Sequence, residues 1–262
     1  MKMKLYQVDA FTDKLFGGNP AAVCPLNVWL PDHLMQQIAQ ENNLSETAFY
    51  VKNGDQYELR WFTPAAEVDL CGHATLASAY VLFFLEGHAG DEIRFHSPRS
   101  GSLPVKRNGE WLTLNFPADT LTPILISNTL LDAFDRTPVA AYKGSSDYLI
   151  VFEKEEHIAQ LVPHMPALER IPARGVIATA PGKDVDFVSR WFGPRVGVPE
   201  DPVTGSAHTT LTPYWSKELG KLSLTARQLS RRGGFLQCRQ LEERVEISGQ
   251  CRLYMRGEIE TN

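Results

Sequence analysis

The chain has 262 residues, of which 43% are hydrophobic and 10% aromatic, and its formal net charge is −5. This composition supplies enough apolar material for one or two buried cores and argues against a disordered chain. An acidic balance also argues against a nucleic-acid-binding protein, because such proteins normally carry a basic stripe that neutralises phosphates. We therefore expect a folded globular protein without a nucleic-acid partner.

Membrane and secretion signals are not evident in the sequence. No run of about 18 apolar residues occurs, and the longest apolar helical candidate, residues 74–85, is too short to cross a bilayer. Residues 1–10 alternate like a strand and lack the apolar segment of a signal peptide. We therefore expect a cytoplasmic protein with no membrane partner.

The cysteines and histidines give no metal signature. The chain has four cysteines without a Cys-x-x-Cys pair: Cys24, Cys71, Cys238 and Cys251. Their separation indicates neither a disulfide framework nor a zinc knuckle. No histidine and aspartate cluster has the spacing of metal ligands either, so we expect no metal site.

In the first half, strands alternate with two helices. Alternating or short apolar runs predict strands over residues 3–11, 21–24, 44–51, 56–63, 91–97 and 102–116. An apolar stripe predicts a surface helix over residues 32–41, whereas residues 73–85 are apolar nearly all round and predict a buried helix. The first half is therefore expected to be a sheet wrapped round a central helix.

The second half repeats this plan. The pattern predicts strands near residues 138–152, 174–180, 186–193, 222–230, 234–240 and 244–256. It also predicts a helical passage near 154–162 and a central helix over 206–219, which Pro213 is expected to kink or shorten. The Pro-rich stretch around Pro117 and Pro123 is the expected boundary, giving halves of residues 1–117 and 118–262. The half into which the terminal strands pack stays open.

One motif occurs in both halves and predicts a duplication. Arg60-Trp61-Phe62 runs into Gly72-His73-Ala74-Thr75, and Arg190-Trp191-Phe192 runs into Gly205-Ser206-Ala207-His208. From the arginine to the glycine the spacing is 12 residues in the first copy and 15 in the second, so the second carries a short insertion. The intervening loops carry four acidic residues: Glu67, Asp69, Glu200 and Asp201.

Each repeated glycine is expected to begin a helix. The N-terminus of a helix has backbone N–H groups without internal partners and a partial positive charge, so it can bind an anion. Two such ends, beginning at Gly72 and Gly205, could face one cleft and hold a small carboxylate.

Three residue types near these helix starts could carry chemistry. Glu46 shares a strand face with apolar residues, which fits either a functional carboxylate or a solvated residue at the strand start. His73 and His208 lie at matching helix starts and could be functional or structural. Cys71 precedes its helix by one residue, where the helix dipole is expected to lower the thiol pKa.

A pair of facing thiols would suit a two-base racemase. However, aligning Gly72 with Gly205 places Thr204 opposite Cys71, which argues against a symmetric thiol mechanism. The sequence also lacks the Gly-x-Ser-x-Gly, Walker A and Gly-x-Gly-x-x-Gly patterns, so neither an α/β-hydrolase nor a nucleotide cofactor is indicated.

Five motifs in order resemble the phenazine-biosynthesis PhzF-like isomerase family and cover nearly the whole chain. They are Asp9-Ala10-Phe11-Thr12, Gly18-Asn19-Pro20-Ala21-Ala22-Val23, Ser45-Glu46-Thr47-Ala48-Phe49, Cys71-Gly72-His73-Ala74-Thr75 and Glu200-Asp201-Pro202-Val203-Thr204-Gly205-Ser206-Ala207-His208. The resemblance implies an α+β fold like diaminopimelate epimerase, with two pseudo-symmetric halves, each a β-sheet wrapped round a central α-helix, and the active site in the cleft between them. It also implies a homodimer.

The resemblance further implies a cofactor-free isomerase that moves a proton on a small cyclic or amino carboxylic acid. The family member that gives the name acts on a dihydro-hydroxyanthranilate. In this chain Glu46 would be the acid/base, with His73 and Asp201 lining the same pocket. Five further residues would bind the substrate: Ser45, Gly72, Thr204, Gly205 and Ser206. A proton shuttle of this kind needs a carboxyl group in a dry, apolar site, as expected for Glu46.

Two other functions remain open. One is a racemase, epimerase or hydrolase that uses the Cys71 thiol. The other is an inactive protein that kept only a carboxylate-binding site. The resemblance predicts the fold and the site residues better than the substrate, because this chain is shorter than the phenazine enzyme.

Overall fold

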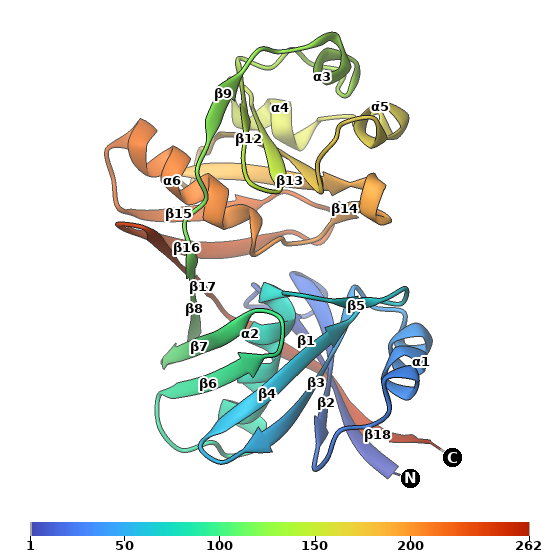
Figure 1. Cartoon of the computed structure of the whole chain (residues 1–262). Helices are drawn as coiled ribbons and strands as arrows, with labels where there is room; N and C mark the ends of the chain where they lie inside the picture. Colours follow the sequence, from blue (N-terminus) through green and yellow to red (C-terminus); the bar gives the residue numbers. More distant parts are fainter. Residues whose placement is uncertain (1, 262) are drawn as a thin grey trace. The chain divides into compact units, whose positions relative to one another are not determined.

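Two α+β units make up the chain in the computed structural model, which describes residues 2–261 (Figure 1). The first unit runs to Asn115 and resumes at Ser248, and the second spans Phe116–Ile247. Each unit is a mixed sheet that holds one buried helix. The predicted α+β class, with a sheet round a helix in each half, is confirmed.

The first unit is built on strands β1 (Lys2–Ala10), β2 (Asn19–Leu26), β3 (Glu46–Asn53), β4 (Gln56–Phe62), β5 (Glu67–Val68), β6 (Glu92–Ser97), β7 (Gly101–Asn108), the start of β8 (Trp111–Pro117), and β18 (Cys251–Glu260). Its buried helix α2 (Gly72–Tyr80) continues into a π-helix, η1 (Val81–Leu85), and packs against β1, β2, β3 and β18. Helix α1 (Asp32–Asn42) buries Met35, Ile38 and Ala39.

The second unit contains β9 (Thr122–Ile124), β10 (Ala140–Lys143), β11 (Asp147–Val151), β12 (Gly175–Pro181), β13 (Phe187–Gly193), β14 (Val198–Asp201), β15 (Ser223–Gln228), β16 (Gly234–Leu241) and β17 (Arg244–Gly249). Its helices are α3 (Asn128–Asp132), α4 (Glu155–Ala159), α5 (Met165–Glu169), the 3-10 turn η2 (Pro194–Val196) and α6 (Ala207–Leu219). Helix α6 is the counterpart of α2 and packs against β11, β15 and β16.

Strand directions repeat between the units. In the first, β2 runs parallel to β3, β3 antiparallel to β4, β4 parallel to β6, and β6 antiparallel to β7. In the second, β11 is parallel to β12, β12 antiparallel to β13, β13 parallel to β15, and β15 antiparallel to β16. The buried helix follows the third strand of the series in both, as a duplication requires.

The repeated arginine has the same structural role in both copies. Arg60 donates from Nε and Nη2 to the two carboxylate oxygens of Glu67, at 2.7 and 2.9 Å, and Arg190 binds Glu200 at the same two distances. The guanidinium groups also lie over Phe62 and Phe192, at 5.2 and 4.9 Å from the ring centres. Two of the four repeated acidic residues therefore hold their loops against the sheet.

The C-terminal strand corrects the expected division into residues 1–117 and 118–262. Strand β18 pairs antiparallel with β1, from Lys2 opposite Glu260 to Ala10 opposite Cys251. The last strand therefore belongs to the first unit, because the hydrogen-bonding edge of β1 that β2 leaves open accepts it. The predicted strand over 244–256 is accordingly two strands, β17 and β18, separated at Gln250.

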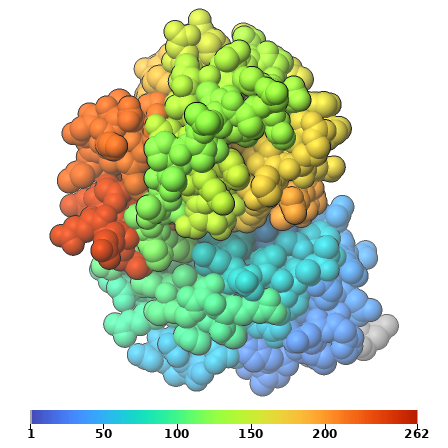
Figure 2. All heavy atoms as spheres, turned by 45° about the horizontal axis from the view of Figure 1, so that its top comes forward, coloured from blue at the N-terminus to red at the C-terminus, as the bar shows by residue number. Residues whose placement is uncertain are grey.

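The chain enters the second unit along an extended segment. Figure 2 shows atoms of this part of the chain, in green, beside orange-red atoms from near residues 220–245. The Ala118 N–H donates to the Glu243 carbonyl at 2.8 Å. The expected boundary at residue 117 lies two residues from the observed one between Asn115 and Phe116.

Helix α6 continues through Pro213, so the expected shortening does not occur. Proline at this position removes the N–H that would bind the carbonyl of Thr209. That carbonyl instead accepts from the Asp119 N–H at 3.1 Å. The entering segment thus replaces the missing hydrogen bond, and the helix runs to Leu219.

Apolar packing fills each unit separately. In the second unit, Phe134 packs edge-on against Phe152 and at a tilt against Phe192, with ring centres 5.7 and 6.0 Å apart. In the first unit, Phe49 and Phe62 make a similar edge contact beside Met35. None of the helices described here has the length and apolar content needed to cross a bilayer.

Gly175 has no room for a side chain, and we expect Gly175→Ala to destabilise the protein. A Cβ at this position would lie 2.2 Å from Cζ2 of Trp191. The indole is rigid and buried, so relief requires movement of the strand, at a cost of roughly 1–3 kcal/mol. Urea unfolding measures the change.

Gly257→Ala is the matched control, because a Cβ there meets nothing within 4 Å. Equal stability of the Gly175 variant and the parent would contradict the close approach of Trp191.

Candidate active site

In the first unit the start of a strand meets the start of the buried helix. Glu46 is the first residue of β3 and His73 the second residue of α2. Oε2 of Glu46 lies 3.1 Å from Nε2 of His73, and the side chains are 18% and 7% exposed. Two residues that the sequence analysis named as catalytic therefore form a buried ion-pair contact, with Ser45 and Gly72 beside them in the chain.

The second ring nitrogen of His73 meets two more side chains. Nδ1 lies 3.2 Å from Nδ2 of Asn19 and 3.4 Å from Sγ of Cys71. Asn19 is fully buried at the start of β2, and its Oδ1 accepts from Oγ of Ser45 at 3.3 Å. Both ring nitrogens of His73 thus have polar neighbours, and Ser45 contacts this network through Asn19.

Burial determines the state of the Cys71 thiol. Burial and the nearby Glu46 charge raise the pKa of Cys71 to about 11, although His73 acts in the opposite direction. The expectation of a lowered pKa is therefore wrong. Desolvation destabilises the buried thiolate more than the helix dipole stabilises it. At neutral pH Cys71 is a thiol.

Glu46 is the charged neighbour of His73. Burial acts to lower the pKa of His73, but the Glu46 carboxylate beside Nε2 acts against burial, and the pKa of His73 is raised above its usual value. The N–H at Nε2 lies beside the carboxylate and orients it.

These side chains also bring together three possible metal-ligand atoms. One ligand atom each from Glu46, Cys71 and His73 lies within 4.8 Å of the others, a cluster that sequence spacing did not reveal. Cys71 is nearest to Nδ1 of the imidazole and Glu46 to Nε2.

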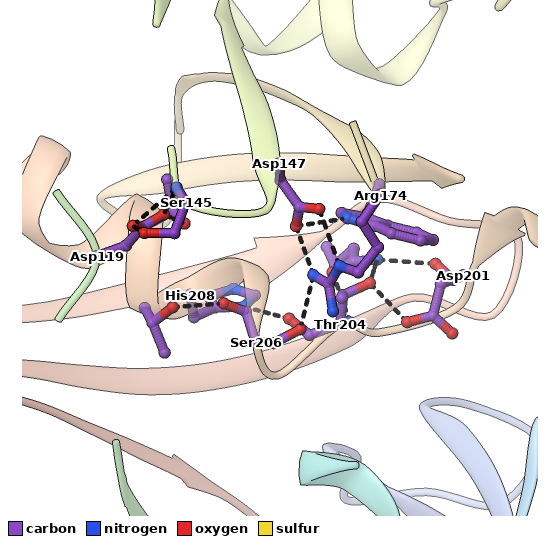
Figure 3. Close-up of polar contacts among 12 residues, drawn as sticks. Asp119, Ser145, Asp147, Arg174, Asp201, Thr204, Ser206 and His208 are labelled. Atoms are coloured by element: carbon purple, nitrogen blue, oxygen red, sulfur yellow. Dashed lines mark hydrogen bonds and ion pairs between the residues drawn. The ribbon is translucent and has the colours of Figure 1, made fainter. Parts of the chain in front are cut away.

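The second unit holds its predicted residues in another polar cluster (Figure 3). Oγ1 of Thr204 donates to Oδ2 of Asp201 at 2.6 Å. Gln228 closes the loop: its Oε1 accepts from the Thr204 N–H at 2.9 Å, and its Nε2 donates to the Asp201 carbonyl at 2.8 Å. The Thr204 hydroxyl therefore donates its hydrogen bond within the protein and orients Asp201.

Ser206 belongs to a second chain of contacts in this unit. Arg174 donates to both carboxylate oxygens of Asp147, at 2.9 and 2.5 Å, and from Nη2 to Oγ of Ser206 at 3.0 Å. The indole N–H of Trp191 also donates to Asp147 at 3.0 Å. The sequence analysis did not identify Asp147 or Arg174, because neither lies in a repeated motif and only the strand register brings them to Ser206.

The helix starts differ from the expected pattern. Helix α2 begins at Gly72 as predicted, but α6 begins at Ala207, two residues after Gly205. In the motif alignment Thr75 corresponds to His208, and both side chains donate to the carbonyl four residues earlier: Thr75 to Cys71 at 2.6 Å and His208 to Thr204 at 2.9 Å. His208 is therefore a structural residue.

Ser206 is accordingly the counterpart of His73, one residue after the aligned glycine. The strand register extends this comparison to Glu46. Trp61 lies opposite Ala48, and Trp191 lies opposite Ile177, so two residues earlier Glu46 corresponds to Gly175. The second unit thus has no side chain at the position of Glu46, and the two units contribute different chemistry.

Comparisons with known proteins agree with this geometry. Residues 8–257 match the PhzC-PhzF family, described as phenazine biosynthesis-like proteins. An uncharacterized isomerase of Pseudomonas aeruginosa is 52% identical over 259 residues, which cover 99% of each chain. The crystal structure of a phenazine biosynthesis protein of the PhzF family from Enterococcus faecalis superposes with a TM-score of 0.97 at 48% identity, covering 100% of both chains.

A more distant structure extends the likeness of fold. A hydroxyproline epimerase of Agrobacterium vitis has a TM-score of 0.59 at 10% identity, covering 98% of this chain and 92% of that one. At this identity the comparison concerns the fold alone.

The buried His208 predicts a loss of stability in acid. Burial lowers its pKa to about 4, against about 6.5 in the unfolded chain. The contribution of neutral His208 to the free energy of unfolding is fully present above about pH 6.5. It falls as the pH approaches 4, because the unfolded chain binds the proton more tightly than the folded chain does. The loss is roughly 3 kcal/mol.

Urea unfolding of the parent and of His208→Gln at pH 7 and pH 4 measures this contribution. Between pH 7 and pH 4 the parent should lose roughly 3 kcal/mol more of its free energy of unfolding than His208→Gln does. His33→Gln, which removes an exposed histidine, is the control. An unchanged difference for His208→Gln would contradict a neutral buried imidazole.

Proposed function

The chain belongs to the PhzC-PhzF family of phenazine biosynthesis-like proteins and is an isomerase; from this premise we propose that it moves a proton on a small carboxylic acid, without a cofactor, using Glu46 as acid/base. The observation that carries the proposal is the buried contact between Glu46 and His73 at the start of α2. A positioned carboxyl group in a largely dry site is what a proton shuttle between carbon atoms requires.

Asymmetry between the units favours one base over two. A symmetric racemase would need the same acid/base group in both copies. The structural counterpart of Glu46 is Gly175, where Trp191 leaves no space for a Cβ, and the counterpart of Cys71 is Thr204. Neither a second carboxylate nor a second thiol is available at the matching position, which supports the proposal that Glu46 both takes the proton and returns it.

His73 supports this role from a fixed position. Its Nε2 lies beside the Glu46 carboxylate, while Asn19 and Cys71 contact Nδ1. In the ionised state the N–H at Nε2 of His73 orients the carboxylate. Once Glu46 has taken the proton, His73 keeps the acid in place until the proton returns to a neighbouring carbon.

The polar cluster of the second unit is proposed to bind the carboxylate group of the substrate. Backbone N–H groups at the start of a helix suit an anion, and Gly205 and Ser206 directly precede α6. Asp201, fixed by Thr204, would accept a hydrogen bond from a hydroxyl or amino group on the same substrate. This donor and acceptor set favours a cyclic or amino carboxylic acid.

Glu46→Gln should abolish most turnover while leaving binding intact. The amide keeps the shape and hydrogen bonding of the side chain but cannot carry the proton, so kcat should fall by roughly 10²–10⁴ with little change in affinity. The assay follows dihydro-hydroxyanthranilate by NMR in heavy water, where the parent should also add deuterium at the carbon that receives the proton.

Cys71→Ser is the matched control, since it alters the same cluster at the Nδ1 atom of His73. A protonated thiol has no acid/base task in this mechanism, and the variant should keep most activity. If Cys71→Ser lost more than about a hundredfold while Glu46→Gln remained active, a thiol mechanism would replace the proposed one.

We also propose that the enzyme is a homodimer, as expected from its family resemblance. Light scattering at micromolar concentration should give twice the 29.3 kDa chain mass. A mass near that of one chain would refute the dimer without affecting the assignment of Glu46.

A further inference from the structure

We propose that Arg174 is a positioning residue that holds the Ser206 hydroxyl ready to donate to the carboxylate of a bound substrate. The proposal rests on the proposed function in one respect, the binding of a substrate carboxylate at Ser206. It adds a residue that lies outside all five sequence motifs, and it separates the roles of Ser206 and Thr204.

The guanidinium group of Arg174 is fixed on two sides. Its Nε and Nη2 form a fork with the carboxylate of Asp147, which is only 3% exposed and also accepts from the Trp191 indole. The same indole ring lies under the guanidinium, 5.3 Å away. Nη2 has a second N–H, and this one donates to Oγ of Ser206 at 3.0 Å (Figure 3).

That contact determines which way the serine hydroxyl points. A hydroxyl group has one donor hydrogen and two acceptor lone pairs. Because Ser206 accepts from Arg174, its lone pair faces the cation and its O–H is directed away from it, available to an external acceptor. Thr204 is the opposite case, since its hydroxyl donates to Asp201 inside the protein.

A cationic partner also strengthens the donor. Hydrogen bonds that involve a charged group are roughly twice as strong as neutral ones, and in a chain of hydrogen bonds each polarises the next. The chain Asp147 to Arg174 to Ser206 therefore prepares one O–H for an anionic oxygen. Lysine could not reproduce it, because an ammonium group lacks the planar fork that binds Asp147 and Ser206 together.

Comparison of the two units supports the same assignment. The strand register aligns Glu46 with Gly175 and Ser45 with Arg174, and the helix starts align His73 with Ser206. In the first unit this junction of strand and helix holds the contact between Glu46 and His73. In the second it holds the contact between Arg174 and Ser206. The same junction thus carries a proton-transfer group in one copy and an anion-binding donor in the other.

A double-mutant cycle tests whether Arg174 acts through Ser206. The probe is 3-hydroxyanthranilate, a stable aromatic analogue of dihydro-hydroxyanthranilate, titrated by calorimetry into the parent, Arg174→Lys, Ser206→Ala and the double variant. Each single change should weaken binding about tenfold, the usual effect of one hydrogen bond to a charged group. The double variant should bind within about twofold of Ser206→Ala, since Arg174 then has no hydroxyl to orient.

Arg195→Lys, an exposed arginine in the same unit, is the control and should bind the probe like the parent. Circular dichroism and thermal unfolding check that each variant is folded. If Arg174→Lys does not fold, Arg174→Gln replaces it in the cycle, because its shorter, neutral side chain lacks the fork that binds Asp147 and Ser206 together.

Two results would overturn the inference. One is multiplicative weakening, to about a hundredfold in the double variant, which would mean that Arg174 acts independently of Ser206. The other is a parent protein whose binding of the probe does not depend on Ser206. Turnover is not measured in these titrations, so an active Glu46→Gln variant would end the proposed mechanism without changing this result.

Discussion

The structure depends on a junction where a strand begins beside the N-terminus of a buried helix. Forming it requires a helix that the sheet surrounds, so α2 carries small or apolar residues on nearly every face and α6 buries Ala207, Leu211 and Trp215. Polar side chains at the junction are then removed from most of the solvent. In that setting an ion pair or a fork of hydrogen bonds keeps its geometry, because a misplaced buried charge would cost several kcal/mol.

Duplication supplied this junction twice, and the two copies diverged in what they place there. Their shared elements are those that stabilise the loop: the arginine and glutamate fork after the aromatic strand, and a side chain that donates to the carbonyl before the helix. The differing elements carry the chemistry. Glu46 and His73 occupy the junction in the first unit, whereas Arg174 and Ser206 occupy it in the second.

The cysteine shows why burial must be weighed against a local field. A thiol at the start of a helix is favoured as a thiolate in water-accessible sites, and for this reason the sequence predicts a lowered pKa for Cys71. In the folded chain Cys71 is 6% exposed and close to a carboxylate. Desolvation and like charge then outweigh the helix dipole, so the thiol is left as a neutral neighbour of His73.

Sequence alone determined the repeat and the buried helix of each half, because these follow from local periodicity and short-range spacing. The α+β fold and the junction residues in the motifs were implied by the resemblance to the PhzF-like family. Only the tertiary structure decided the rest. Pairing of β18 with β1 joins residues about 250 positions apart, and Arg174 reaches Ser206 through a strand register that no local pattern encodes. Likewise, the rescue of the Thr209 carbonyl by Asp119 and the high pKa of Cys71 arise from neighbours that are distant in the chain.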